Sequence, residues 1–291
     1  MQSSFSFVTG KPDVCLLPMP KWTWTGRDFE AAERVAAASE LPTVVYYPFD
    51  SWDDPARGWW GPRQWAEPLH RYVLRADIVA GPSLPVSGGP HDVIPLPYPP
   101  LVRRLPAPPD LTAAAIDVHF AGFFREPGWA PPSADTRDRR YRGHLVRQLQ
   151  AALPPGRVRI RKAAYWNDGA PANLRRRYVR ELDRSAIVLA PAGNGYLTFR
   201  HADAWARGRV ALSEPVHRLV QVPEPASWES GDVCLTYDPA ADDIIEVVER
   251  GLEDPARLAD IAASGWRYGR RWTDPARQAR HLADALRARL G

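Results

Sequence analysis

Residues 185–214 read SAIVLAPAGNGYLTFRHADAWARGRVALSE, and this stretch decides the fold. It begins with a short apolar run at 186–190, which is typical of a buried strand. A turn rich in proline and glycine follows at 191–195, and a helix is predicted over 196–207, ending at Gly208. A second apolar run starts at Val210. Strand, glycine turn, helix and strand in this order form one unit of a parallel α/β sheet.

The turn at 191–195 has the features of a phosphate-binding site. A helix N-terminus carries unpaired N–H groups and a partial positive charge. Gly193 and Gly195 let a ligand approach the backbone closely. Thr198 supplies a cap or a hydroxyl group, and Arg200 supplies a fixed, planar positive charge. We therefore predict that a phosphate or diphosphate binds here.

Asp203 lies three residues after Arg200 and therefore shares its face of the predicted helix. A carboxylate in this position is well placed to accept hydrogen bonds from the diol of a ribose. The alternative is an ordinary strand-to-helix turn with a solvated Asp203. The spacing alone leaves both interpretations open.

The region around this stretch resembles the C-terminal half of exostosin-type glycosyltransferases. That family shows a tyrosine, a leucine, a serine, a short apolar strand, a proline and a glycine turn. Ser/Thr-x-Arg-x-x-Glu/Asp-Ala follows, before a glycine and another strand. The chain departs from the pattern at Asp203, where Glu is commoner, and at Arg209, where Cys is frequent. The matching residues are Tyr178, Leu182, Ser185, Pro191, Gly193, Thr198, Arg200, Asp203, Ala204 and Gly208.

The resemblance implies an α/β enzyme of the GT-B type, in which two Rossmann-like domains with parallel sheets face a cleft. It implies a nucleotide-sugar donor held mostly by the second domain, and a glycan or small-molecule acceptor. No metal and no further cofactor is expected. The residues predicted to bind the donor are Arg125, Gly193, Asn194, Gly195, Thr198, Arg200 and Asp203.

The chain is predicted to divide at a basic, proline-rich linker over 103–109. Residues 1–109 are expected to form a Rossmann-like acceptor-side domain that ends in this linker. Residues 110–272 are expected to form the domain that binds the nucleotide sugar. Its first strand, at 116–122, resembles the family's strand ending in Phe-x-Gly. By the same resemblance, a terminal helix within 273–291 is expected to pack back on the first domain.

Acidic residues follow the predicted strand at 42–47. Ligands of parallel sheets collect at the carboxyl ends of strands, and inverting transfer needs a base for the acceptor hydroxyl. Asp53, and after it Asp50, are therefore the predicted catalytic residues, with turn-stabilising carboxylates as the alternative. A divalent metal is a further alternative for this acidic segment, which lacks D-x-D spacing. His119 lies inside an apolar strand and is interpreted as a core histidine.

Composition limits the remaining function classes. The 291 residues suffice for one large domain or two smaller ones. No apolar run approaches the roughly 20 residues that span a bilayer, and no signal peptide is evident, which predicts a cytoplasmic protein without stable membrane insertion. The net charge of +4 comes almost entirely from arginine, but no compact basic and aromatic motif indicates nucleic-acid binding.

These observations favour a cytoplasmic glycosyltransferase that moves a sugar from a nucleotide-sugar donor to a hydroxyl group, with inversion and without metal. The alternative is a catalytically degenerate protein of the same fold that binds a nucleotide or a glycan. The chain is short for two full domains. Either the first domain is minimal, or the protein forms a homodimer.

Overall fold

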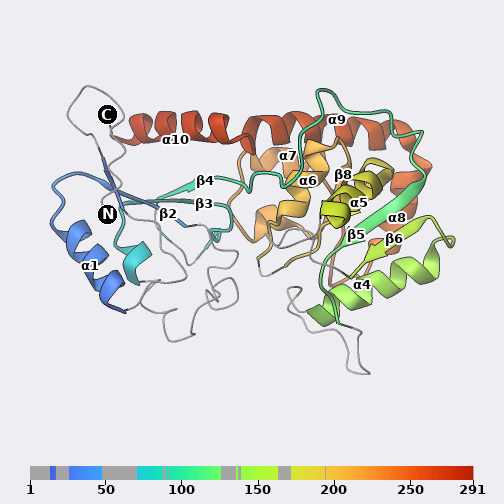
Figure 1. Cartoon of the computed structure of the whole chain (residues 1–291), viewed down its shortest axis with the longest axis horizontal. Helices are drawn as coiled ribbons and strands as arrows, with labels where there is room; N and C mark the ends of the chain where they lie inside the picture. The colour runs from blue at the N-terminus through green and yellow to red at the C-terminus, as the bar shows by residue number, and fades with distance from the viewer. Residues whose placement is uncertain are drawn as a thin grey trace.

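The computed structural model describes residues 14–17, 26–47, 71–87, 90, 92–125, 136, 139–162, 172–193 and 195–290. These residues form two sheets, one of four strands and one of five, and every pair of neighbouring strands is parallel. In Figure 1 the first sheet lies at the left of the molecule and the second at the right. The predicted α/β fold with two parallel sheets is confirmed.

The first sheet has the strand order β1-β2-β3-β4. Helix α1, Gly26–Ala37, connects β1 to β2 and buries Phe29 and Ala32 in the core of this sheet. The strands are β1 (Cys15–Leu16), β2 (Thr43–Tyr46), β3 (Ile78–Gly81) and β4 (Val93–Pro95).

The second sheet has the strand order β6-β5-β7-β8-β9. Its strands are β5 (Ile116–Ala121), β6 (Val158–Arg161), β7 (Ser185–Leu189), β8 (Val210–Ser213) and β9 (Leu235–Thr236). Its helices are α4 (Arg139–Ala152), α5 (Ala172–Asp183), α6 (Phe199–Ala206), the 3₁₀ helix η2 (Val216–Arg218), α7 (Pro225–Glu229), α8 (Ile244–Glu253) and α9 (Pro255–Trp272).

Strand β7 lies at the centre of this sheet and is buried on both faces. Ile187 and Leu189 pack with α4 and α8 on one face, whereas Val188 packs with α5 and α6 on the other. A strand covered by helices on both faces needs apolar side chains in both directions. This is why the sequence at 186–190 is continuously apolar rather than alternating.

The C-terminal helix α10, Pro275–Leu290, continues from the end of α9 and reaches the first sheet (Figure 1). Leu286 of α10 packs in one cluster with Val44, Ile78 and Ile94. A short antiparallel bridge between Pro85 and Val220 also joins the two halves. The last helix of the chain therefore completes the core of the first sheet.

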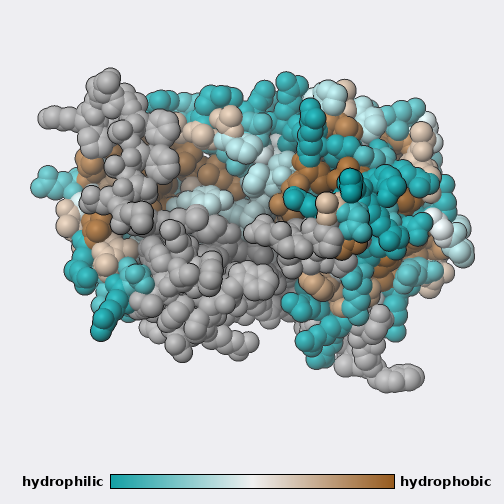
Figure 2. All heavy atoms as spheres, viewed as in Figure 1, coloured by the Kyte–Doolittle hydropathy of each residue, from teal (hydrophilic) through white to brown (hydrophobic). Residues whose placement is uncertain are grey.

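The outer surface around the second sheet is strongly polar. Figure 2 shows hydrophilic side chains over much of this part of the molecule, where the arginine-rich helices α4 and α5 lie. Among the helices of the described ranges, none is long and apolar enough to cross a membrane.

Candidate functional site

The carboxyl ends of β5, β7, β8 and β9 meet at one edge of the second sheet, because these strands are parallel neighbours. Gly122 follows β5, and the turn at 191–195 follows β7. Glu214 follows β8, and Tyr237 follows β9. Ligands of open parallel sheets bind at this edge. Most of the predicted donor-binding residues that the structure describes lie here.

Arg200 is fixed in position at the end of β5. Its side chain is buried, and its Nε–H group donates a hydrogen bond of 2.8 Å to the carbonyl oxygen of Ala121. The guanidinium carbon lies 5.2 Å from the centre of the Phe120 ring and 5.1 Å from that of Phe199. These contacts place a permanent positive charge directly at the carboxyl edge.

Gly122 is required for this placement. A Cβ atom added to Gly122 would lie 2.3 Å from Nη2 of Arg200, which is far closer than atoms can approach. Any larger residue at this position would therefore displace the guanidinium. The Phe-x-Gly strand and the x-Arg-x-x-Asp helix, both identified in the sequence, meet at this contact.

The glycine turn is closed by a hydrogen bond of 2.7 Å from the N–H of Gly193 to the carbonyl oxygen of Gly195. A Cβ atom on Gly193 would lie 3.5 Å from Cγ2 of Thr198, an ordinary contact. The fold therefore has room for a larger residue at position 193. Close approach of a ligand to the backbone is a reason for a glycine at this position. Asn194, also predicted to bind the donor, lies outside the described residues.

Thr198 is the N-cap of α6, as its sequence position suggested. Its backbone N–H donates a hydrogen bond of 3.2 Å to Nδ1 of His201, which thus takes the part that Glu or Gln has in a capping box. Burial lowers the pKa of His201 to about 3. The imidazole is therefore neutral and can accept this hydrogen bond.

Asp203 has different surroundings from those expected. It is fully buried, and one carboxylate oxygen accepts hydrogen bonds from the N–H groups of Leu101, at 2.7 Å, and Val102, at 3.2 Å. The other oxygen accepts a bond of 2.8 Å from the Tyr178 hydroxyl. Burial raises the pKa of Asp203 to about 6. The carboxylate ties α6 to α5 and to the segment after β4, and the ribose contact stays a prediction.

Glu214, the last residue of the stretch at 185–214, is a site residue to which the sequence analysis gave no role. It is buried, and it accepts a hydrogen bond of 2.7 Å from Ala192 N–H and one of 2.9 Å from the Tyr237 hydroxyl. Burial raises the pKa of Glu214 to about 7. Glu214 therefore joins the ends of β7, β8 and β9. Its position, directly after a buried strand, was the available signal.

The remaining predicted residues are less constrained. Arg125 has an exposed side chain four residues beyond β5, and its backbone N–H bonds to the carbonyl oxygen of Arg139 at 2.9 Å. Asp50 and Asp53, predicted as catalytic, lie outside the described residues.

His119 is fully buried in β5, 3.8 Å from Glu181, and burial lowers its pKa, as fits a core histidine. In the described part of the chain, no three His, Cys, Asp or Glu residues form a group able to hold a metal ion.

Residues 139–286 match the model of a family described as glycosyl transferase-like. Sucrose-phosphate synthase from Thermosynechococcus elongatus has a similar structure, with a TM-score of 0.51 and 13% identity over 90% of this chain and 71% of that chain. A spinosyn forosaminyltransferase gives a TM-score of 0.43 and 16% identity over 94% of this chain and 76% of that chain. A search of curated proteins found no match. The likeness to sucrose-phosphate synthase confirms the predicted GT-B fold.

Proposed function

The chain belongs to the glycosyl transferase-like family, and from this premise we propose that it transfers a sugar from a nucleotide-sugar donor to a hydroxyl-bearing acceptor. The enzyme class follows from the family. The nucleotide nature of the donor, the inverting course of the reaction and its independence of metal are parts of the proposal. The resemblance of the second half of the chain to exostosin-type glycosyltransferases is also part of the proposal.

One observation carries the proposal, namely the placement of Arg200 beneath Gly122 at the carboxyl edge of the second sheet. The N-terminus of α6 and the glycine turn lie at the same edge. A diphosphate placed here would meet a fixed guanidinium group and the positive end of a helix. Both groups are positioned before the donor binds, so that no reorganisation is needed during the reaction.

The chemistry proposed for this edge is electrostatic. Negative charge develops on the leaving diphosphate as the bond to the sugar breaks, and preorganised positive groups stabilise that charge. Arg200 supplies a full charge and α6 a partial one, while the exposed Arg125 is close enough in sequence to β5 to reach the same edge. Glu214 supports the turn through Ala192 N–H. The base for the acceptor hydroxyl is proposed to be Asp53 or Asp50.

A panel of UDP, GDP, ADP, dTDP and CDP, read by thermal unfolding, tests the donor site. We expect one nucleotide at about 100 times its Kd to stabilise the wild type by about 2.7 kcal/mol. Arg200→Ala should abolish this response, because the guanidinium is the fixed charge of the site. Gly193→Ala should abolish it too while leaving the unliganded protein as stable as the wild type, because the fold has space for the methyl group.

Gly193→Ala is the decisive variant because it separates ligand approach from folding. An unchanged nucleotide response in Gly193→Ala would refute the proposed contact with the turn. No response of the wild type to any of these nucleotides, together with no consumption of nucleotide sugars, would favour the degenerate binding protein over the enzyme.

A further inference from the structure

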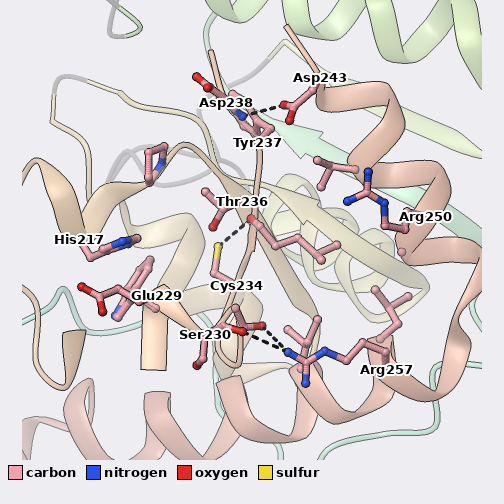
Figure 3. A pocket seen from close by; sticks show the side chains of 18 of the residues that line it. His217, Glu229, Ser230, Cys234, Thr236, Tyr237, Asp238, Asp243, Arg250 and Arg257 are labelled. Carbon is pink, nitrogen blue, oxygen red and sulfur yellow. Dashed lines mark hydrogen bonds between the residues drawn. The ribbon is translucent and has the colours of Figure 1, made fainter. Parts of the chain in front are cut away.

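A cavity lies along β9, the edge strand of the second sheet. The cavity has a volume of about 650 Å³, within the range of about 300–1,000 Å³ that is usual for ligand pockets. Figure 3 shows His217 and Glu229 on one side of it and Arg250 and Arg257 on the other. The first pair comes from η2 and α7, and the second from α8 and α9.

His217 is an unusual group in this wall. Both ring nitrogens are shielded from solvent, and within the described part of the chain neither has a hydrogen-bond partner. The ring lies 6.4 Å from that of Trp228, and burial lowers the pKa of His217. A neutral imidazole can both donate and accept. A ligand that bonds to His217 would therefore replace no hydrogen bond within the described part of the chain.

The charges of the cavity disfavour a phosphate ligand. Its lining includes four carboxylates, Glu229, Asp238, Asp243 and Asp254, against three arginines, Arg218, Arg250 and Arg257. Arg257 already contacts Asp232 at 3.2 Å. A diphosphate would therefore meet more negative than positive charge. This contrasts with the edge where Arg200 lies, so the two sites differ in the ligands that they suit.

The geometry also disfavours an extended peptide, although peptides bind open sheet edges by adding a strand. Strand β9 has only two residues, too few for a paired ladder. What the cavity offers instead is hydrogen-bonding side chains on opposite walls. Thr236, Glu229 and Arg250, each with a polar side chain, all line it. Neutral ligands with many hydroxyl groups match such a mixture of donors and acceptors.

We propose that the β9 cavity, lined by His217, Glu229, Thr236 and Arg250, binds a neutral saccharide. The inference rests on the proposed function and names the acceptor as a glycan, part of which is held away from the transfer site. The cavity adjoins the carboxyl edge of the second sheet at Tyr237, which follows β9. Pro215 and Tyr237 line it, and Tyr237 shares Glu214 with the glycine turn through hydrogen bonds of 2.9 Å and 2.7 Å.

The test uses the full chain on immobilised neutral oligosaccharides of glucose, mannose, galactose and N-acetylglucosamine, two to four units long. We expect the wild type to bind at least one series. Glu229→Gln should bind it about tenfold or more weakly, as is typical when a hydrogen bond to a charged group is lost. His217→Ala should weaken binding in the same direction. Glu229 is exposed, so its substitution leaves the fold intact.

Two controls make the result specific. Glu249→Gln makes the same chemical change on the exposed surface of α8 outside the cavity, and it should bind like the wild type. Arg200→Ala should keep oligosaccharide binding while losing the nucleotide response. No binding by the wild type, or equal binding by Glu229→Gln, would overturn the saccharide site. If nucleotides still bind in that case, the proposed function stands without it.

Discussion

At the scale of single residues, buried carboxylates organise the carboxyl edge of the second sheet. Glu214 is 1% exposed, yet it accepts hydrogen bonds from both the glycine turn and Tyr237. Burial of a carboxylate disfavours its charged form, which is why the pKa of Glu214 rises to about 7. The turn at 191–195 is therefore held by a group whose ionisation changes near neutral pH.

We expect Glu214→Gln to flatten part of the pH dependence of stability. Because the pKa of Glu214 is higher in the folded protein than in the unfolded chain, its contribution is fully present below about pH 4.5 and is lost as pH rises through 7. Between pH 5 and pH 8 the wild type should lose up to about 3 kcal/mol more unfolding free energy than the variant. Urea unfolding at both pH values measures this, and parallel profiles would contradict it.

At the scale of elements, the segment after β4 is attached to the second sheet's helices. Besides the two bonds to Asp203, Leu105 N–H donates to Ala206 O at 2.9 Å, and Trp266 Nε1–H donates to Leu105 O at 3.1 Å. Arg104 donates to the carbonyl oxygen of Gly269 at 2.9 Å. The proline-rich segment predicted as a linker is thus fixed along α6 and α9.

Asp203→Asn tests whether Asp203 serves this attachment or a ribose. An amide cannot accept all three hydrogen bonds, so we expect a loss of about 1–3 kcal/mol in unfolding free energy. If Asp203 serves only the attachment, the Kd for the stabilising nucleotide will not change. Asp260→Asn, on the exposed face of α9, is the matched control and should behave like the wild type. Weaker nucleotide binding at unchanged stability would instead support the ribose contact.

At the scale of the whole molecule, the two sheets are connected more than once. The segment after β4 leads from the first sheet to the second, and α10 returns to the first sheet (Figure 1). Near β3, Gln221 N–H donates to Leu84 O at 2.8 Å beside the bridge of Pro85 and Val220. Leu286 of α10 is part of the core of the first sheet, so the stability of that sheet depends on α10.

Leu286→Ala should therefore destabilise the protein by about 2 kcal/mol, the lower end of the range for buried leucines, because Leu286 is 9% exposed. Leu290→Ala, four residues later and 37% exposed, should change stability by less than about 0.5 kcal/mol. Urea unfolding of both variants makes the comparison. Equal effects would mean that α10 does not complete the first core in solution.

The sequence by itself determined the strand, turn, helix and strand at 185–214 and the α/β class, and its resemblance to exostosin-type glycosyltransferases implied the two parallel sheets. These features could be predicted because apolar runs, glycine and proline determine the conformation of residues close to them in sequence. The sequence also placed Arg200 and Thr198 at the start of a helix, since these are local positions. Strands β2 and β5 were predicted from the same local signals, at 42–47 and 116–122.

Only the tertiary structure decided what these residues contact. Arg200 reaches Ala121, 79 positions earlier in the chain, and Asp203 reaches Leu101, 102 positions earlier. Glu214 gained its role only when β7, β8 and β9 were placed side by side. The β9 cavity likewise exists only where η2, α7 and α8 are assembled around an edge strand. Such contacts depend on how distant segments pack, which spacing along one chain does not encode.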